Sequence, residues 1–374
     1  MSENFDVVIV GAGIVGSACA FECASRGLRT AVVEGKGVGS GATAAAMGHI
    51  VVMDDSPAQM ALTRYSQALW RDLAARLPAD VEYECRGTLW VASDEEELEM
   101  VRRKSASYAS AGVRAEILDS QSLAEAEPHL RQPLSGALLV PSDAVIDPPR
   151  AAGFLLREAQ QLGARLYAQN ALSALAGIVR LDNGTGLHAA RIVNACGADA
   201  GDLMPGLPIR KRKGHLAITE PCPGFIRHQL VELGYLKSAH ALAADSVAFN
   251  VQPRRSNQIL IGSSRQFGVE DSAVDARILA SVIERAQWYL PEIGALSVLR
   301  AWTGFRAATP DKLPLIGPWP EDPSLLLATG HEGLGITTSL ATARILTDHL
   351  LGEESGIPIE PYLPARLCRT GAPA

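Results

Sequence analysis

The chain has 374 residues, of which 47% are hydrophobic and 20% charged, which is typical of a folded protein large enough for two domains. Its formal net charge of -7 argues against general binding of nucleic acids. The sequence has no run of roughly 18 uninterrupted apolar residues, so we expect no membrane span.

Residues 5–34 predict a strand, a tight turn, a helix over 15–26 and a second strand. The turn has the spacing GxGxxG, at Gly11, Gly13 and Gly16. The first glycine permits the turn, the second lets the backbone approach a pyrophosphate, and the third lets the helix pack on the strand. Glu34 ends the second strand, where a carboxylate accepts hydrogen bonds from ribose hydroxyls. Together these features predict a dinucleotide site. The carboxylate of Glu34 argues against a dinucleotide with a phosphate on its ribose 2′ position.

The next part of the chain combines helical and β patterns. A glycine-rich loop over 35–48 leads into a predicted helix of small residues, and the apolar spacing of 57–77 predicts another helix. Residues 81–93 predict a β-hairpin around Arg86-Gly87. An acidic start and a basic continuation predict a helix over 94–112.

The rest of the chain repeats this change of pattern. We expect a helix over 150–162, one strand over 163–175 and another over 188–197. Alternating apolar residues over 209–309 predict a mainly antiparallel sheet with one helix, over 273–289. A strand, a glycine turn and a long helix fill 325–351.

These patterns predict an α/β fold with two domains. The first is a Rossmann-type dinucleotide-binding domain, a ββα sandwich built from three separate segments, 1–80, 141–208 and 310–374. The second is an inserted α+β substrate domain with a mainly antiparallel sheet, formed by 81–140 and 209–309.

Four further stretches carry a resemblance to a known family: GSGATAAAMGH (39–49), RIVNACGADAG (191–201), FRAATPDKLPLIGP (305–318) and TGHEGLGITTS (329–339). In this order after GxGxxG, they resemble the D-amino acid oxidase superfamily of FAD enzymes. The nearest branch is that of glycine oxidase, sarcosine oxidase and the flavoprotein subunit of D-hydroxyproline dehydrogenase. The resemblance covers nearly the whole chain and implies FAD rather than NAD.

The resemblance also implies how FAD is held. Sarcosine oxidases have a cysteine for covalent attachment near the position where this chain has Ala307 and Ala308, so we expect noncovalent FAD. The glycine turn before the last helix offers free backbone N–H groups to a reduced flavin, although a plain strand-to-helix turn is the alternative. The expected FAD-binding residues are Gly11, Gly13, Ile14, Val15, Gly16, Glu34, Gly35, Lys36, Ser40, Gly41, Ala42, Thr43, Ala45, Ala46, Met47, Gly48, Leu172, Ala195, Gly197, Gly304, Arg306, Gly330, His331, Glu332, Gly333, Leu334, Gly335, Ile336 and Thr337.

The resemblance further implies a substrate site. Arg306 is expected to pair bidentately with the substrate carboxylate, the alternative being a structural salt bridge with Asp311. His49 and His331 are candidate proton partners of the substrate amine, or hydrogen-bonded walls beside the cofactor. The candidates for aromatic walls, which plain core packing would also explain, are Phe249 and Tyr235.

The expected reaction is oxidation of a small amino or imino acid by hydride transfer from Cα to flavin N5, giving an imine. The similarity favours a D-hydroxyproline (D-proline-like) dehydrogenase subunit that passes electrons to iron–sulfur or other electron-transfer subunits. The alternatives are an oxygen-using oxidase of the glycine or sarcosine type, an accessory electron-transfer flavoprotein without its own substrate, and an NAD-dependent dehydrogenase.

Two further patterns bear on location and partners. Six cysteines without CxxC spacing predict free thiols, a cytoplasmic location and no bound metal or iron–sulfur cluster. The basic run from Arg210 to Lys213 predicts solvated strand edges and interdomain salt bridges, or a docking surface for an acidic partner subunit.

Overall fold

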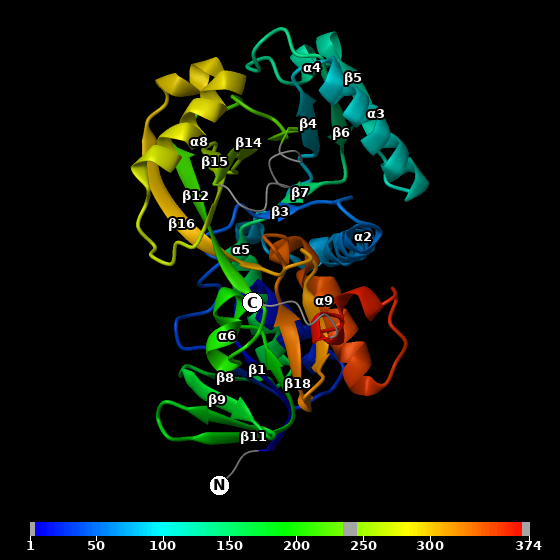
Figure 1. Ribbon diagram of the computed structural model, residues 1–374, viewed down its shortest axis with the longest axis vertical. Coiled ribbons are helices and arrows are strands. Elements are labelled where there is room, and N and C mark those ends of the chain that lie inside the picture. Colours follow the sequence, from blue (N-terminus) through cyan, green and yellow to red (C-terminus); the bar gives the residue numbers. More distant parts are fainter. Residues whose placement is uncertain (1–3, 235–244, 369–374) are drawn as a thin grey trace.

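The computed structural model describes residues 4–234 and 245–368, which form two large sheets, one above the other in the view of Figure 1, with several helices between them. The first sheet follows the order β17 (Leu315–Trp319), β18 (Asp322–Thr329), β11 (Gly186–Asn194), β1 (Asn4–Val10), β2 (Thr30–Val33) and β8 (Arg165–Tyr167). β9 (Ala171–Leu175) and β10 (Ile178–Leu181) continue it from β11. β1 pairs in parallel with both β2 and β11, and its run VVIV is apolar because both faces of this central strand are covered.

Helices cover one face of the first sheet. α1 (Ile14–Ser25) packs against both α5 (Pro148–Gln161) and α9 (Gly335–Leu351), and α2 (Pro57–Leu73) packs on α9. α1 consists largely of small residues because it is buried between two neighbouring helices. The opposite face of the sheet has its own apolar core, which combines side chains of β1 and β2 with those of β9, β10 and β11. Two short helices, α6 (Ala200–Leu203) and α10 (Ala365–Cys368), complete this part of the molecule.

The second sheet follows the order β16 (Val298–Ala308), β12 (Arg210–Thr219), β15 (Ile259–Phe267), β14 (Ser246–Pro253), β13 (Gln229–Glu232), β4 (Thr88–Ala92), β6 (Gly136–Val140) and β5 (Glu116–Asp119). Its pairings are antiparallel except between β13 and β4. α8 (Ala276–Tyr289) and α4 (Ser120–Ala126) share the apolar core on one face. α3 (Glu95–Ser110) covers the β4 and β6 end of the other face, and the rest of that face turns toward the first sheet.

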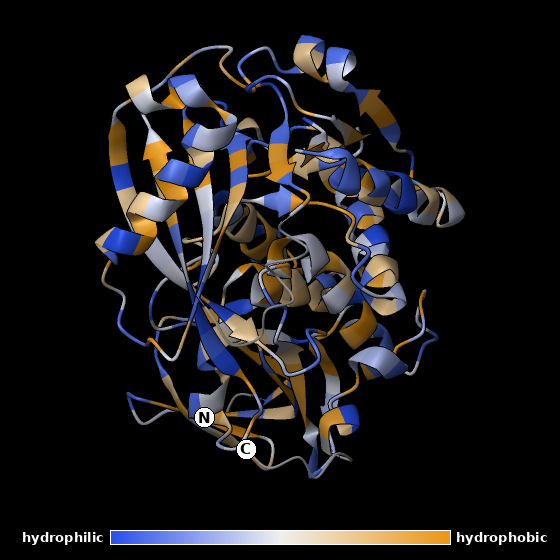
Figure 2. Ribbon diagram, turned by 45° about the horizontal axis from the view of Figure 1, so that its top comes forward, coloured by the Kyte–Doolittle hydropathy of each residue, from blue (hydrophilic) through white to orange (hydrophobic). Residues whose placement is uncertain are grey.

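A two-stranded ribbon of β3 (His49–Ile50) and β7 (Ala144–Val145) lies between the two sheets (Figure 1). Figure 2 shows hydrophobic residues concentrated on the strands and hydrophilic residues on the outer surfaces of the helices. Within the described ranges, no helix combines the length and apolarity needed to cross a membrane.

The α/β fold with a Rossmann-type sheet and a second, mainly antiparallel sheet is confirmed. The first sheet draws on residues 4–33, 165–194 and 315–329, and the second on 88–140 and 210–308. The boundaries assigned to the two domains remain a prediction.

Three local predictions were wrong. Residues 81–93 form no hairpin, because β4 pairs with β13 and β6 while Glu84 bridges to Val145. The small-residue segment after Gly41 forms turns instead of a helix, between two glycines with positive φ, at 60° for Gly41 and 98° for Gly48. The single strand expected over 163–175 is two strands, β8 and β9, which pair with different neighbours.

Candidate active site

A cavity of about 640 Å³ lies between the two sheets. This volume falls within the range of roughly 300–1,000 Å³ that is usual for cofactor and small-molecule sites. The first sheet contributes its glycine turn and the carboxyl end of β2, and the second contributes side chains from six neighbouring strands. The cavity therefore has one wall from each sheet.

The turn after β1 requires glycine for reasons of space. Gly11 has φ +104°, and a Cβ on it would lie 2.6 Å from the carbonyl oxygen of Ala195. A Cβ on Gly16 would lie 2.0 Å from the carbonyl oxygen of Gly11, so this glycine lets α1 pack directly on the turn. Gly13 is the N-cap of α1 and has no side chain to cap the helix. The positive end of the α1 dipole therefore faces the cavity, as a pyrophosphate site requires.

Glu34 is fixed at the end of β2 by two backbone groups. Its carboxylate accepts hydrogen bonds from the N–H of Ala12 at 2.8 Å and from the N–H of Lys36 at 2.7 Å. Each carboxylate oxygen has more than one lone pair, so acceptor capacity remains for ribose hydroxyls. Glu34 also lines the cavity, and this arrangement fits the ribose of a dinucleotide.

The loop that ends at Gly48 is held in place by the second sheet. Gln252 Nε2 on β14 donates to the carbonyl oxygen of Met47 at 2.9 Å, and Trp302 Nε1 on β16 donates to that of Ala45 at 3.4 Å. A Cβ on Gly304 would lie 2.3 Å from the Cβ of Ala45, so β16 passes directly against the loop. The loop is therefore a shared wall between the dinucleotide end and the substrate end of the cavity.

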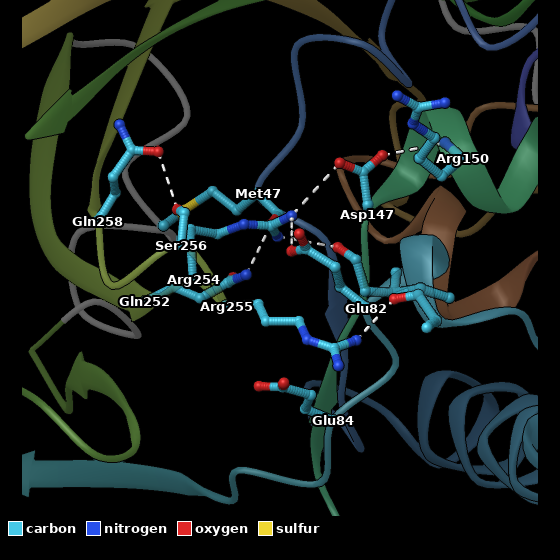
Figure 3. A network of polar contacts seen from close by, with 12 residues as sticks. Met47, Glu82, Glu84, Asp147, Arg150, Gln252, Arg254, Arg255, Ser256 and Gln258 are labelled. Atoms are coloured by element: carbon cyan, nitrogen blue, oxygen red, sulfur yellow. Dashed lines mark hydrogen bonds and ion pairs between the residues drawn. The ribbon is translucent and has the colours of Figure 1, made fainter. Parts of the chain in front are cut away.

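A network around Arg254 ties the end of β14 to the start of α5 (Figure 3). Its guanidinium donates to the carbonyl oxygen of Ile146 at 3.0 Å and pairs with Glu82 at 2.7 Å and Asp147 at 3.4 Å. Neighbouring Arg255 is exposed and donates to the carbonyl oxygen of Ala79 at 2.7 Å. Arg254 thus fixes the second sheet relative to the first.

The N-terminus of α9 faces the cavity beside the first turn of α1, where a Cβ on Gly335 would lie 3.8 Å from Val15 Cγ2. Its N-cap, Leu334, makes no side-chain capping bond, and residues 331–336 line the cavity. Glu332 N donates to the carbonyl oxygen of Ala307 at 3.0 Å, which holds the glycine turn against β16. A helix N-terminus at this place stabilises negative charge on a cofactor ring.

Arg306 lies on β16 with its guanidinium over β12 and β15. Nη1 donates to the carbonyl oxygen of Ser264 at 2.9 Å. A Cβ on Gly214 would lie 2.4 Å from the same nitrogen, so this glycine leaves the space that the guanidinium occupies. The alternative of a salt bridge with Asp311 is wrong, because that carboxylate pairs with Arg366 at 2.6 Å. Arg306 instead lines the cavity, as expected for a carboxylate-binding residue.

Two residues of the basic run are buried rather than solvated. Arg212 lines the cavity and pairs with Glu332, and Lys213 on the other face of β12 pairs with Asp271 at 3.2 Å. Solvated strand edges were therefore the wrong interpretation for these two residues, because the alternation of β12 turns both side chains into packed layers. Lys211 pairs with Asp199 at 2.8 Å and links β12 to the first sheet.

Several cationic side chains gather around one buried carboxyl group at this end of the cavity. Burial raises the pKa of Glu332 above its usual value, while the surrounding cations oppose that shift. The four cations that line the cavity near this carboxyl group are Arg212, Arg265, Arg306 and Lys312. A cluster of cationic side chains attracts an anionic substrate group.

Both candidate histidines are held neutral near pH 7. Burial lowers the pKa of His331 to about 4, and its Nε2 makes a hydrogen bond with Thr342 Oγ1 at 3.0 Å. Burial, aided by the positive charge of Arg254, lowers the pKa of His49 to about 4. Its Nε2 is buried without a hydrogen-bond partner in the described part of the chain. A base with a pKa near 4 binds protons weakly at neutral pH, so both rings fit hydrogen-bonding walls better than proton acceptors.

A buried carboxyl group lies behind the wall formed by β4. Asp143 Oδ1 accepts from Gln67 Nε2 at 2.9 Å and from the N–H of Val52 at 3.3 Å. Burial raises its pKa to about 7, against the effect of these hydrogen bonds. Asp143 itself is not among the residues that line the cavity, whereas neighbouring Thr88 is.

Most of the residues predicted for the cofactor line the cavity, together with His49. Four predicted residues are not in the lining: Gly16, Leu172, Gly330 and Thr337. Leu172 is 65% exposed on β9, and the neighbouring segment 169–171 lines the cavity in its place. Thr337 supports the site from behind, since its Oγ1 donates to the carbonyl oxygen of His49 at 2.9 Å.

The aromatic wall predicted at Phe249 is not found in the lining. Phe249 is fully buried in the core beneath α8, where its ring stacks on Tyr289 with centroids 4.2 Å apart. The strand was predicted correctly, but the next residue, Asn250, is the one that faces the cavity. Tyr235 lies outside the described residues.

Sequence reasoning missed the polar side chains that the second sheet adds to the cavity. They are Thr88, Trp90, Gln229, Asn250, Ser263 and Arg265. Only their alternation with core residues along each strand could have indicated them. Across the described ranges, no group of three His, Cys, Asp or Glu side chains is placed to hold a metal ion.

Comparison with known proteins agrees with this geometry. The family described as FAD dependent oxidoreductase matches residues 6–349. The chain is 29% identical to subunit HcnC of the hydrogen cyanide synthase of Pseudomonas aeruginosa, over 98% of this chain and 97% of that protein. It is 28% identical to the glycine oxidase of Geobacillus kaustophilus over 97% of each chain. The crystal structure of the Geobacillus kaustophilus glycine oxidase superposes with a TM-score of 0.86 at 26% identity, covering 97% of this chain and 98% of that one.

Proposed function

From the premise that this chain belongs to the FAD-dependent oxidoreductase family, with FAD as its cofactor, we propose that it oxidises a small cyclic imino acid of the D-hydroxyproline type. Oxidation of an amino acid by FAD is the general activity of this branch, and the enzyme is an FAD-dependent amino acid oxidase or dehydrogenase. The observation that carries the proposal is the position of Arg306. Its guanidinium lies over Gly214, beside the glycine turn before α9 and the loop that ends at Gly48.

Arg306 binds the substrate carboxylate in this proposal. A guanidinium presents two parallel N–H groups that match a carboxylate bidentately. The cationic side chains around Glu332 add to the attraction for an anion. A substrate anchored by its carboxylate at this place lies between the second sheet and the FAD-binding wall.

The protein's own contribution to the reaction is mainly orientation. FAD, when bound, supplies the acceptor for the two electrons and the hydrogen that leave Cα, so that a C=N bond forms from the amine lone pair. The amine must be neutral to provide that lone pair. His49 and His331 are neutral near pH 7. They therefore add no positive charge that would repel a protonated amine when it enters the site and before it loses its proton. Binding in one orientation, rather than a nucleophile, accounts for catalysis.

Electrons then leave through a partner subunit in the dehydrogenase that we favour. This choice is supported by the relative from Pseudomonas aeruginosa, whose name describes it as a subunit of a larger synthase. Similarity to the glycine oxidase of Geobacillus kaustophilus favours the second candidate, an oxidase that transfers the electrons to oxygen. Both candidates share the carboxylate site at Arg306.

The test follows the flavin absorbance of the purified chain without oxygen. D-hydroxyproline, D-proline, glycine and sarcosine are added separately, and we expect D-hydroxyproline to bleach the flavin fastest. Admission of air then distinguishes the acceptors: slow return of colour indicates a dehydrogenase, and rapid return indicates an oxidase.

The control is Arg306→Lys, which keeps a positive charge but removes the planar fork. This variant should bind FAD and lose most of its substrate-driven bleaching. A wild-type protein that keeps its colour with all four compounds would contradict the proposal and favour an accessory flavoprotein without its own substrate.

A further inference from the structure

We infer that three side chains of the second sheet form a site for a hydroxyl group of the substrate, and we call this site the polar recess: Trp90, Gln229 and Asn250. The inference rests on the proposed function and concerns the part of the substrate that Arg306 does not bind. It identifies residues that determine which amino or imino acid is preferred.

The three residues are neighbours on adjacent strands. Val231 on β13 pairs with Trp90 on β4 on one side and with Asn250 on β14 on the other. Gln229 lies two residues earlier on β13 and therefore on the same face of the sheet. All four side chains line the cavity. The recess is thus one continuous patch over three strands.

The recess contains buried polar atoms without partners. Trp90 Nε1, Gln229 Oε1 and Asn250 Oδ1 are buried and make no hydrogen bond within residues 4–234 and 245–368. The three side chains are 3%, 0% and 8% exposed, respectively. Gln229 Nε2 donates to the carbonyl oxygen of Ala144 at 3.2 Å, which fixes the amide and leaves Oε1 as its unpartnered atom. Buried polar groups are normally satisfied, so three unsatisfied ones in a cavity wall indicate a ligand that completes them.

The chemistry of these atoms selects the ligand. An indole N–H only donates, and an amide oxygen only accepts. A hydroxyl group does both, so it can accept from Trp90 and donate to Gln229 or Asn250 at the same time. A methyl group would satisfy none of these atoms. A carboxylate would satisfy only the donor and would lie beside two carbonyl-type oxygens, and it has a better site among the cations.

The distance to Arg306 suits a small substrate. The guanidinium lies over β12 and reaches the backbone of β15, and β14 is the next strand in the sheet. Neighbouring strands lie about 4.8 Å apart, so the recess begins about 5–10 Å from the guanidinium. A compact amino or imino acid with a hydroxyl on its side chain or ring spans the gap to Asn250 on β14, and Gln229 and Trp90 lie on the next two strands of the sheet. The recess strands contribute uncharged side chains to the lining, whereas β12, β15 and β16 contribute arginines.

The experiment compares substrates that differ only by a hydroxyl group. D-hydroxyproline is compared with D-proline, and D-serine with D-alanine, by anaerobic flavin reduction with the full-length FAD-loaded protein. In the wild type, the rate constant per substrate concentration should be about 10-fold or more higher for the hydroxylated member of a pair.

Asn250→Leu replaces the amide by an apolar group of similar size and should remove most of this preference by slowing the hydroxylated substrate. Gln229→Met tests the recess independently in case the first variant does not fold. Gln252→Leu is the matched control on the same strand, because its amide bonds the Met47 carbonyl. This control should slow both members of a pair equally.

The possible outcomes distinguish failure of the polar recess from failure of the proposed function. Equal rates within a pair for the wild type, fastest reduction by glycine, or an unchanged preference in both recess variants would overturn the polar recess and leave amino acid oxidation intact. Absence of reduction by every compound would overturn the proposed function and the recess with it.

Discussion

The two walls of the cavity are built in different ways. The wall from the first sheet consists of backbone: glycines, helix N-termini and short loops that follow strands in the sequence. The wall from the second sheet consists of side chains that alternate with core residues on six strands. Backbone groups bind the parts common to every dinucleotide, whereas side chains can change without altering the sheet. The cofactor is therefore set by the fold, and the substrate by single residues.

The largest expected effect tests the backbone wall. Gly16→Val places side-chain atoms where even a Cβ would lie 2.0 Å from the Gly11 carbonyl oxygen, so α1 must move away from the turn. We expect loss of nearly all bound FAD, measured as flavin absorbance per chain. Gly201→Ala is the control, since a Cβ there has no atom within 4 Å. A Gly16→Val protein with full FAD content would contradict the role of this turn.

The second prediction tests the side-chain wall. Arg306→Gln removes the positive charge and the planar fork that we propose bind the substrate carboxylate. Truncating one partner of a buried charged pair costs about 2–5 kcal/mol, so we expect kcat/KM to fall by about 30-fold or more. FAD content should stay near that of the wild type, because the cofactor contacts of the first sheet are unchanged. Equal losses of FAD and activity would mean that the two walls are not separable.

The two walls also differ in how well the sequence alone predicts them. The backbone wall can be predicted from local motifs. GxGxxG, Glu34 and the glycine turn before α9 each specify the local conformation from a few neighbouring residues. The side-chain wall depends on which strands are neighbours, and the parallel pairing of β13 with β4 across more than a hundred residues has no local signal. Strand alternation was visible around Phe249, but the pattern alone could not tell which of its faces met the helix and which met the cavity. Arg212 was wrongly predicted to be solvated for the same reason, because the sequence does not show which layer each face of β12 meets.

The third prediction concerns the contact between the walls. Arg254→Ala removes hydrogen bonds from a charged group that is 11% exposed, and it leaves the Ile146 carbonyl oxygen without its donor. We expect the free energy of unfolding to fall by about 2–3 kcal/mol. Arg255→Ala is the matched control, because this neighbouring side chain is exposed and should change stability by less than about 0.5 kcal/mol. Similar losses in urea unfolding for both variants would argue against a specific role of Arg254.

The last prediction concerns the dependence of stability on pH. The pKa of Asp143 is raised from 3.8 to about 7, so the folded state favours the neutral acid, and this contribution to stability is present below pH 3.8 and lost as pH rises through 7. The pKa values of His49 and His331 are lowered from 6.5 to about 4, so their contributions are present above pH 6.5 and lost as pH falls through 4. The two kinds of group therefore act in opposite directions.

Asp143→Asn should remove the acid's contribution. As pH rises from 4 to 7, the free energy of unfolding of the wild type should fall relative to that of this variant by about 1.4 kcal/mol per pH unit. His331→Asn should show the reverse, with the wild type gaining stability relative to the variant as pH rises over that range. Thermal unfolding at several pH values measures both differences, and parallel curves for the wild type and a variant would exclude the corresponding group.

The order of the segments in the first sheet has a consequence for biosynthesis. The lining of the cavity runs from Val10 to Ile336, and β18 joins the sheet beside β11 only near the end of the chain. A nascent chain that stops before Gly335 lacks the N-terminus of α9 and cannot present both helix N-termini to the cavity. We therefore expect FAD to be captured only after β18 and the start of α9 have been synthesised, which makes cofactor binding a late step in folding of the nascent chain.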